Sequence, residues 1–136
     1  MAVAASDKSL HLTVITPARA VFDAPAAAVV APAFDGEVGV LPGHAPMMAL
    51  LGTGEVRITT ADGGRKRLAV RGGFLQVNKN KVTLLTPESI TAEDIKKDAL
   101  AAEAQKAESE QPAKPEERVA LDAKKAWIRA RQKITS

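Results

Sequence analysis

Histidine and cysteine, which often supply catalytic bases, nucleophiles and metal ligands, are scarce in this chain. It has two histidines, His11 and His44, in separate segments, and no cysteine. The motifs G-x-S-x-G, G-x-x-x-x-G-K-S/T and H-E-x-x-H, which mark serine hydrolases, phosphate-binding loops and zinc proteases, are absent. Without cysteine, the chain can form neither a disulfide nor a thiolate metal site. The sequence therefore predicts a protein with no catalytic residue, no bound metal and no cofactor.

His44 lies in the most distinctive stretch of the chain, Gly36–Pro46, which reads G-E-V-G-V-L-P-G-H-A-P. The prolines at both ends of P-G-H-A-P hold the backbone angle φ at about −65°. Gly43 accepts a positive φ at little cost, so Pro42–Gly43 suits a type II turn. From physics alone we expect a stiff structural corner that displays His44.

Basic side chains gather near the C-terminus, around the single tryptophan, Trp127. They are Lys124, Lys125, Arg129, Arg131 and Lys133. Cations near the C-terminus of a helix are favoured by the helix dipole, so a solvated helix face is the simpler interpretation. The sharper interpretation is a docking surface for an acidic partner, with Trp127 as an apolar anchor.

The composition bounds the remaining function classes. The chain has 136 residues, of which 46% are hydrophobic and 3% aromatic, with a net charge of +3. A small basic nucleic-acid-binding β-domain is one alternative, but such proteins usually place aromatic residues among the basic ones. The run Arg65–Lys66–Arg67 is expected to be the solvated side of a hairpin.

A hydrolase or sugar-binding sandwich is a second alternative, but the sequence shows no nucleophile–base pair for it. No apolar run of about 18 residues is present, so no membrane insertion is expected.

The residues named above must be positioned by two kinds of element. Residues 1–9 are predicted to be a flexible N-terminal tail, and residues 10–88 an antiparallel β-sandwich domain. Short alternating segments recur there about every 8–12 residues with turn signals between them, as in sandwiches and barrels. The expected strand segments are 10–16, 19–22, 27–31, 54–60, 68–70, 74–77 and 82–85. Pro25 and Pro32 are expected to separate the short strands near them.

Residues 89–136 are predicted to form a domain of two antiparallel helices, a helical hairpin. Thr91 and Asp94 form a capping-box pattern that opens a helix over residues 92–108, and Pro115 suits the first position of a second helix. The apolar stripes are expected at Ile95, Ala99 and Ala102 in the first helix, and at Val119, Ala123, Ala126, Ala130 and Ile134, with Trp127 beside them, in the second. Short helices with thin stripes are marginal in water, so the hairpin must dock on the sandwich or on a partner.

A β-sandwich with G-E-V-G-V-L-P-G-H-A-P, followed by a helical hairpin, resembles the epsilon subunit of the rotary F-type ATP synthase, which is equivalent to the mitochondrial delta subunit. Further similar stretches are L-H-L-T-V-I-T-P at Leu10–Pro17, R-G-G-F-L-Q-V at Arg71–Val77 and V-T-L-L-T-P-E-S-I at Val82–Ile90. Arg71 stands where the family usually has serine, and the Gly72–Gly73 pair is expected to form a bulge or a close backbone approach. The resemblance covers residues 10–96 well and the hairpin by its architecture.

The resemblance implies a non-catalytic central-stalk (rotor) subunit of the proton-translocating ATP synthase, which links the gamma subunit to the c-ring. By position, Pro42, Gly43 and His44 are expected to contact gamma, and Gly36 and Glu37 to contact the c-ring. In some bacteria the hairpin extends along gamma and inhibits ATP hydrolysis by meeting the catalytic beta and alpha subunits. The residues that match this inhibitory helix are Lys124, Lys125, Trp127, Arg129 and Arg131.

Two further expectations follow from the same resemblance. Some members bind ATP through I/L-D-x-x-R-A in the first helix, but here Lys96 replaces the aspartate and Ala99 replaces the arginine. The side chains that would orient and hold the nucleotide are missing, so ATP binding is not expected, and neither is nucleic-acid binding. The expected location is the cytoplasmic face of the bacterial inner membrane, peripherally, as part of the ATP synthase complex.

Overall fold

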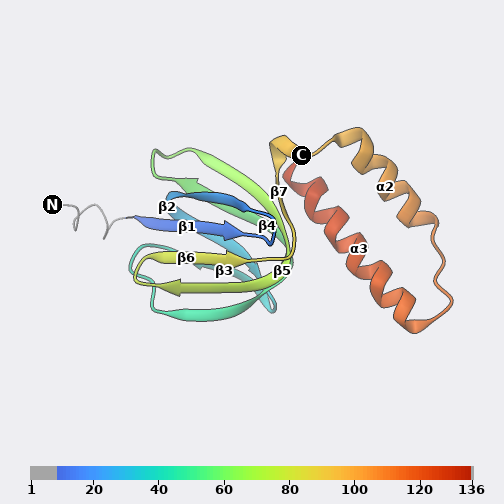
Figure 1. Ribbon diagram of the computed structural model, residues 1–136, viewed down its shortest axis with the longest axis horizontal. Helices are drawn as coiled ribbons and strands as arrows, with labels where there is room; N and C mark the ends of the chain where they lie inside the picture. Colours follow the sequence, from blue (N-terminus) through green and yellow to red (C-terminus); the bar gives the residue numbers. More distant parts are fainter. Residues whose placement is uncertain (1–8, 136) are drawn as a thin grey trace.

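The computed structural model describes residues 9–135, a β-sandwich followed by two helices (Figure 1). The elements are β1 (Leu10–Ile15), β2 (Ala20–Ala33), β3 (Gly36–Val40), β4 (Met47–Thr60), β5 (Arg65–Asn78), β6 (Lys81–Leu85), β7 (Ser89–Thr91), the 3-10 helix η1 (Ala92–Asp94), α2 (Lys97–Ser109) and α3 (Pro115–Ile134). This order confirms the predicted fold class. Apart from Ser9, the predicted tail of residues 1–9 lies outside the described residues.

The strands form one continuous sheet that closes on itself. Its order is β1-β6-β5-β4-β2-β3, and β1 also pairs with β2. β1 and β6 run parallel, whereas the other pairs among the described strands are antiparallel. The parallel pair was not predicted. β7 pairs with β5, so the sheet continues through Thr91 before the helical part begins.

The core of the sandwich is aliphatic and follows the alternation of the strands. In β1, Leu10, Leu12 and Val14 are almost fully buried, while His11 between them is exposed. This is the period of two that places alternate side chains on opposite faces of a strand. The same core includes Val56 of β4 and other aliphatic residues of β2, β3, β5 and β6.

The two short strands predicted on either side of Pro25 are in fact one strand, β2, which contains both Pro25 and Pro32. Proline cannot donate a ladder hydrogen bond and is tolerated at edges and bulges. The ladder between β2 and β4 begins at Ala26, and its register shifts between Val30 and Ala33. Both prolines therefore lie where this ladder is absent or interrupted, and the strand continues through them.

β5 runs unbroken past the pair Gly72–Gly73, and at Gly73 its backbone comes close to β6. The φ of Gly73 is +116°, and a Cβ there would lie 1.9 Å from the carbonyl oxygen of Leu85 in β6. The expected close backbone approach is thus confirmed. The phase of the strand changes across the glycines, because Leu68 and Val70 face the core before them and Leu75 and Val77 after them.

The first helix begins later than the capping-box pattern predicted. Thr91 Oγ1 donates to the Asp94 carboxylate at 3.2 Å and makes no capping bond to the backbone. Residues 92–94 form a 3-10 turn, Ile95 is extended, and α2 starts at Lys97. The extended backbone lets Ile95 pack against two apolar clusters, one beneath α3 and one between the helices.

The hairpin docks on the outer face of β4 and β5 through α3 (Figure 1). Trp127, Ala130 and Ile134 pack against Ala69 of β5, and Leu100, Ala107, Leu121 and Ile128 join α2 to α3. The predicted stripe was therefore wrong at Val119, Ala123, Ala99 and Ala102, which are exposed. The larger side chains at Leu100, Leu121 and Ile128 remove more apolar area from water than alanines do, so they determine which faces are buried.

Candidate partner-binding surfaces

An apolar row crosses the outer surface of the sandwich. Leu50 of β4 lies opposite Phe74 of β5, Phe74 lies opposite Leu85 of β6, and Leu85 lies beside Ile15 of β1. Phe34 continues the row, since its backbone N–H donates to the Leu50 carbonyl at 2.9 Å. Phe34 is 80% exposed, and Leu50 and Phe74 are each 51% exposed. These five residues are called the apolar row below.

The apolar row and the helical hairpin occupy different halves of the same strands. The outward residues Glu55 of β4 and Ala69 of β5 lie under α3, whereas Leu50 and Phe74, further along the same two strands, remain exposed. Contiguous exposed apolar residues on a folded protein mark an interaction site. Sequence reasoning missed this row. Its signal is the apolar doublets such as Leu50–Leu51, because adjacent residues of a strand point to opposite faces.

The corner at P-G-H-A-P forms as predicted. The Leu41 carbonyl accepts a hydrogen bond from the His44 N–H at 3.1 Å, and Gly43 has φ +86°, as a type II turn requires. The Gly43 N–H also donates to Asn80 Oδ1 at 2.7 Å, which fixes the corner to the β5–β6 turn. His44 is half-buried, and its Nδ1 lies 2.7 Å from the Ala45 carbonyl oxygen.

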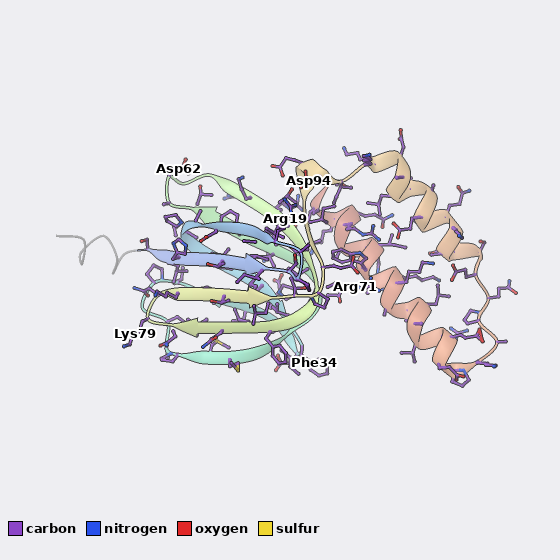
Figure 2. All side chains as sticks on the ribbon, viewed as in Figure 1. Arg19, Phe34, Asp62, Arg71, Lys79 and Asp94 are labelled. Atoms are coloured by element: carbon purple, nitrogen blue, oxygen red, sulfur yellow. The ribbon has the colours of Figure 1, made fainter. Side chains whose placement is uncertain are left out.

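Glu37 lies at the other end of the sandwich from His44. Lys79, next to the P-G-H-A-P corner, and Phe34, next to Gly36, mark these two ends in Figure 2. The structure therefore does not bring the two sets of predicted contact residues together. Gly36, with φ +136°, opens β3 at an exposed turn.

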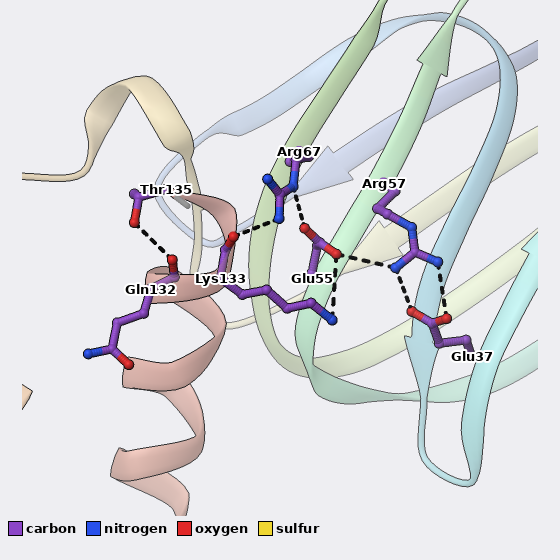
Figure 3. Close-up of polar contacts among 7 residues, drawn as sticks. All are labelled: Glu37, Glu55, Arg57, Arg67, Gln132, Lys133 and Thr135. Atoms are coloured by element: carbon purple, nitrogen blue, oxygen red, sulfur yellow. Dashed lines mark hydrogen bonds and ion pairs between the residues drawn. The ribbon is translucent and has the colours of Figure 1, made fainter. Parts of the chain in front are cut away.

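The Glu37 carboxylate is held by a bidentate contact with Arg57 of β4, at 2.8 and 3.0 Å (Figure 3). The hydrogen bonds from Arg57 lower the pKa of Glu37, which keeps this exposed carboxylate ionised. Sequence reasoning did not identify Arg57 as its partner. The polar alternation of β4, with Glu55 and Arg57 on one face, was a signal for it.

The basic residues of α3 do not form one free cluster. Lys124 pairs with Glu110 at 2.9 Å, and Arg131 pairs with Glu103 of α2 at 2.8 and 3.0 Å. Trp127 is buried, and the Arg131 guanidinium lies 5.1 Å from the centre of its ring. Within residues 9–135, no ion pair involves Lys125 or Arg129.

Among the described side chains, no three His, Asp or Glu residues lie close enough to hold a metal ion. No helix of residues 9–135 is long and apolar enough to cross a membrane.

Known proteins with similar sequences and folds point to one family. The family model of the ATP synthase delta/epsilon chain, β-sandwich domain, matches residues 9–92. The ATP synthase epsilon chain of Symbiobacterium thermophilum is 49% identical over 87 residues, which are 63% of this chain and 62% of that relative. The chain thus spans less than two thirds of the length of that relative. The epsilon chain of Pelotomaculum thermopropionicum is 42% identical over 106 residues, 78% of this chain and 77% of the relative.

The fold is also similar to that of a solved chain in the Euglena gracilis mitochondrial ATP synthase, determined with OSCP, F1 and the c-ring. The TM-score is 0.83 at 23% identity, covering 95% of this chain and 82% of the other. At this identity the likeness concerns the fold alone. The family match over the sandwich, together with the bacterial relatives, shows that the chain belongs to the ATP synthase delta/epsilon chain family.

Proposed function

We propose that this protein is a non-catalytic subunit of the central stalk of an F-type ATP synthase, where it joins the gamma subunit to the c-ring. The apolar row carries this proposal. It is a surface of the family's β-sandwich that the chain's own hairpin leaves uncovered, and burying such residues is the main favourable term in protein association.

In this proposal the gamma subunit covers the apolar row and the corner at Pro42, Gly43 and His44. The turn at Gly36 and Glu37 faces the c-ring, from the opposite end of the sandwich. A subunit that connects two partners needs two separated contact regions, and the separation of Glu37 from His44 supports this assignment. The subunit is then a peripheral component on the cytoplasmic face of the bacterial membrane.

The nucleic-acid alternative receives no support from the described residues. Arg67 is not a solvated member of the run Arg65–Lys66–Arg67, because it contacts Glu55 and the end of α3. ATP binding is still not expected, since Lys96 and Ala99 replace the aspartate and the arginine of the family's nucleotide-binding motif.

Binding to purified gamma subunit tests the proposal. Replacing Phe74 or Leu50 by Asp puts a charge into the apolar row and should weaken binding at least tenfold, which corresponds to about 1.4 kcal/mol. Val119→Asp is the matched control, because Val119 is 69% exposed but lies on α3, outside the row. Unfolding curves of all variants check that the sandwich is intact. Equal gamma affinity for the row variants and the control would refute the proposal.

A further inference from the structure

Glu55 is a buried carboxylate for which the proposed function has no use. Its side chain is 3% exposed, on the outer face of β4 beneath the end of α3 (Figure 3). Arg67 Nε donates to one carboxylate oxygen, Oε2. The other oxygen, Oε1, accepts from Arg57 Nη1 at 3.2 Å and lies 3.8 Å from Lys133 Nζ. A buried carboxylate needs such partners, because burying it unpaired is costly.

Arg67 connects this carboxylate to the hairpin. Its Nη2 donates to the main-chain carbonyl of Lys133 at 2.6 Å. Lys133 lies in the last turn of α3, where the helix dipole is negative and where the N–H of the C-cap residue Thr135 approaches the carbonyls of Gln132 and Lys133. The Arg67 guanidinium thus lies between two negative groups, the Glu55 carboxylate and the end of α3.

The two contacts of Arg67 differ in what they depend on. Arg67 and Glu55 lie on the neighbouring strands β5 and β4, where Arg67 is opposite Arg57, so their contact belongs to the sheet. The contacts of Arg67 and Glu55 with Lys133 exist only when α3 is docked. Without Arg67, docking would bring the negative end of α3 onto a buried carboxylate that has lost one of its cations.

We propose that Arg67, oriented by Glu55, is a latch that holds the C-terminal end of α3 on the sandwich and so stabilises the docked hairpin. Glu37 is connected to the same latch, because Arg57 Nη1 is shared between Glu37 and Glu55. A continuous set of ion pairs thus connects the β2–β3 turn with the end of α3. The latch acts within the free chain and requires no partner.

Hydrogen exchange of the isolated, full-length protein tests the latch. A lifted hairpin is a marginal pair of helices whose amides exchange quickly, so protection in α3 reports docking. Arg67→Gln should speed exchange at Trp127–Ile134 by about ten- to a hundredfold, as expected for losing a hydrogen bond to a charged group. It should also increase acrylamide quenching of Trp127, the single tryptophan, which is buried between α3 and β5.

Arg65→Gln is the matched control, because it removes the same charge from an exposed residue of β5 that forms no ion pair within residues 9–135. It should leave α3 protection and Trp127 quenching unchanged. In the double variant Glu55→Gln/Arg67→Gln, the buried carboxylate is also neutralised, so protection should recover in part relative to Arg67→Gln.

Circular dichroism and the exchange rates of β1 and β6 show whether the sandwich itself is intact in each variant. If Arg67→Gln disturbs the sandwich, Arg67→Lys replaces it: the charge remains but the forked contact is lost, and an intermediate effect is expected. Unchanged α3 exchange in an intact Arg67 variant would overturn the latch, as would an equal effect of Arg65→Gln. Failure of gamma binding would not affect this result.

Discussion

The charge of Glu37 depends mainly on one neighbour, Arg57. Arg57 presents two nitrogen atoms to the carboxylate, and the pKa of Glu37 is lowered mainly by these hydrogen bonds. The folded-state pKa lies below the ordinary 4.5, so the interaction is fully present above about that pH and is lost as the pH falls through the lowered value. At neutral pH the β2–β3 turn therefore presents an ionised carboxylate in a fixed position.

If this turn faces the c-ring, Glu37→Lys should impair proton pumping by the assembled enzyme. The lysine reverses the charge and repels Arg57, so both the surface and the geometry of the turn change. Assembly with gamma should be unaffected, since His44 and the apolar row lie elsewhere. The measurement is ATP-driven proton pumping relative to ATP hydrolysis in membranes that contain equal amounts of the subunit.

Asp35→Lys is the control for this experiment, because Asp35 is an exposed acid in the same turn for which no ion pair is seen within residues 9–135. It makes the same charge change without disturbing Arg57. Normal pumping by Glu37→Lys, or equal defects in both variants, would contradict the assignment of Glu37 to the ring contact.

At the scale of elements, α2 and α3 are joined by apolar contacts and by the Glu103–Arg131 pair. Arg131 is 14% exposed in its side chain, contacts both Glu103 oxygens and lies over Trp127. The hydrogen bonds from Arg131 lower the pKa of Glu103. The contribution to stability is therefore present above the unfolded-state pKa of about 4.5 and disappears as the pH falls through the folded-state value.

Glu103→Gln should lower the free energy of unfolding of the hairpin by about 0.5–1 kcal/mol at pH 7. The effect is modest because the Glu103 side chain is 37% exposed and solvent screens the pair. Urea unfolding followed by Trp127 fluorescence, from pH 7 to pH 3, measures it. The parent and variant curves should converge at acid pH. A difference that does not decrease as the pH falls would show that the charge of Glu103 is not the cause.

The same elements show what the sequence can predict. Alternation and turn residues identified the sandwich, and Pro115 begins α3 as its position indicated. The extent of β2 could not be predicted, because Pro25 and Pro32 break a strand unless the neighbouring ladder is interrupted at those places. That interruption is a property of the closed sheet and of its register with β4.

The buried faces of the helices and the contacts between distant residues were equally out of reach. Alanines at Ala99 and Ala123 fit a helical period as well as Leu100 and Leu121 do, and only the position of the sheet shows which face is covered. The Arg67–Lys133 contact joins residues 66 positions apart, and nothing local indicates it. The motif at P-G-H-A-P was predictable because its turn is fixed by neighbouring residues.

At the scale of the whole molecule, the docked hairpin hides part of the surface expected to inhibit ATP hydrolysis. Trp127 and Ile128 are buried, and Lys124 and Arg131 are engaged in ion pairs within the hairpin. If the second helix meets the catalytic subunits, Trp127 is available to them only after α3 leaves the sandwich, whereas Ile128, Lys124 and Arg131 also require α3 to separate from α2. Inhibition and docking should therefore compete, and the latch at Arg67 should set the balance between them.

This competition predicts opposite effects of two changes on ATP hydrolysis by the assembled enzyme. Deleting residues 111–136 removes the helix that is expected to inhibit hydrolysis and should raise the steady-state rate. Arg67→Gln retains that helix but weakens its docking, so the rate should fall. Arg65→Gln should behave as the parent does.

Combining Arg67→Gln with the deletion identifies the cause. If the latch acts through the hairpin, the combined variant should hydrolyse ATP at the rate of the deletion alone, because Arg67 then has no helix to release. A rate that stays low would show that Arg67 acts at another contact of the sandwich. Equal rates for the parent, the deletion and Arg67→Gln, at equal subunit content, would mean that the hairpin does not inhibit this enzyme, and its role would then be to cover Glu55 and Ala69 on the outer face of the sheet.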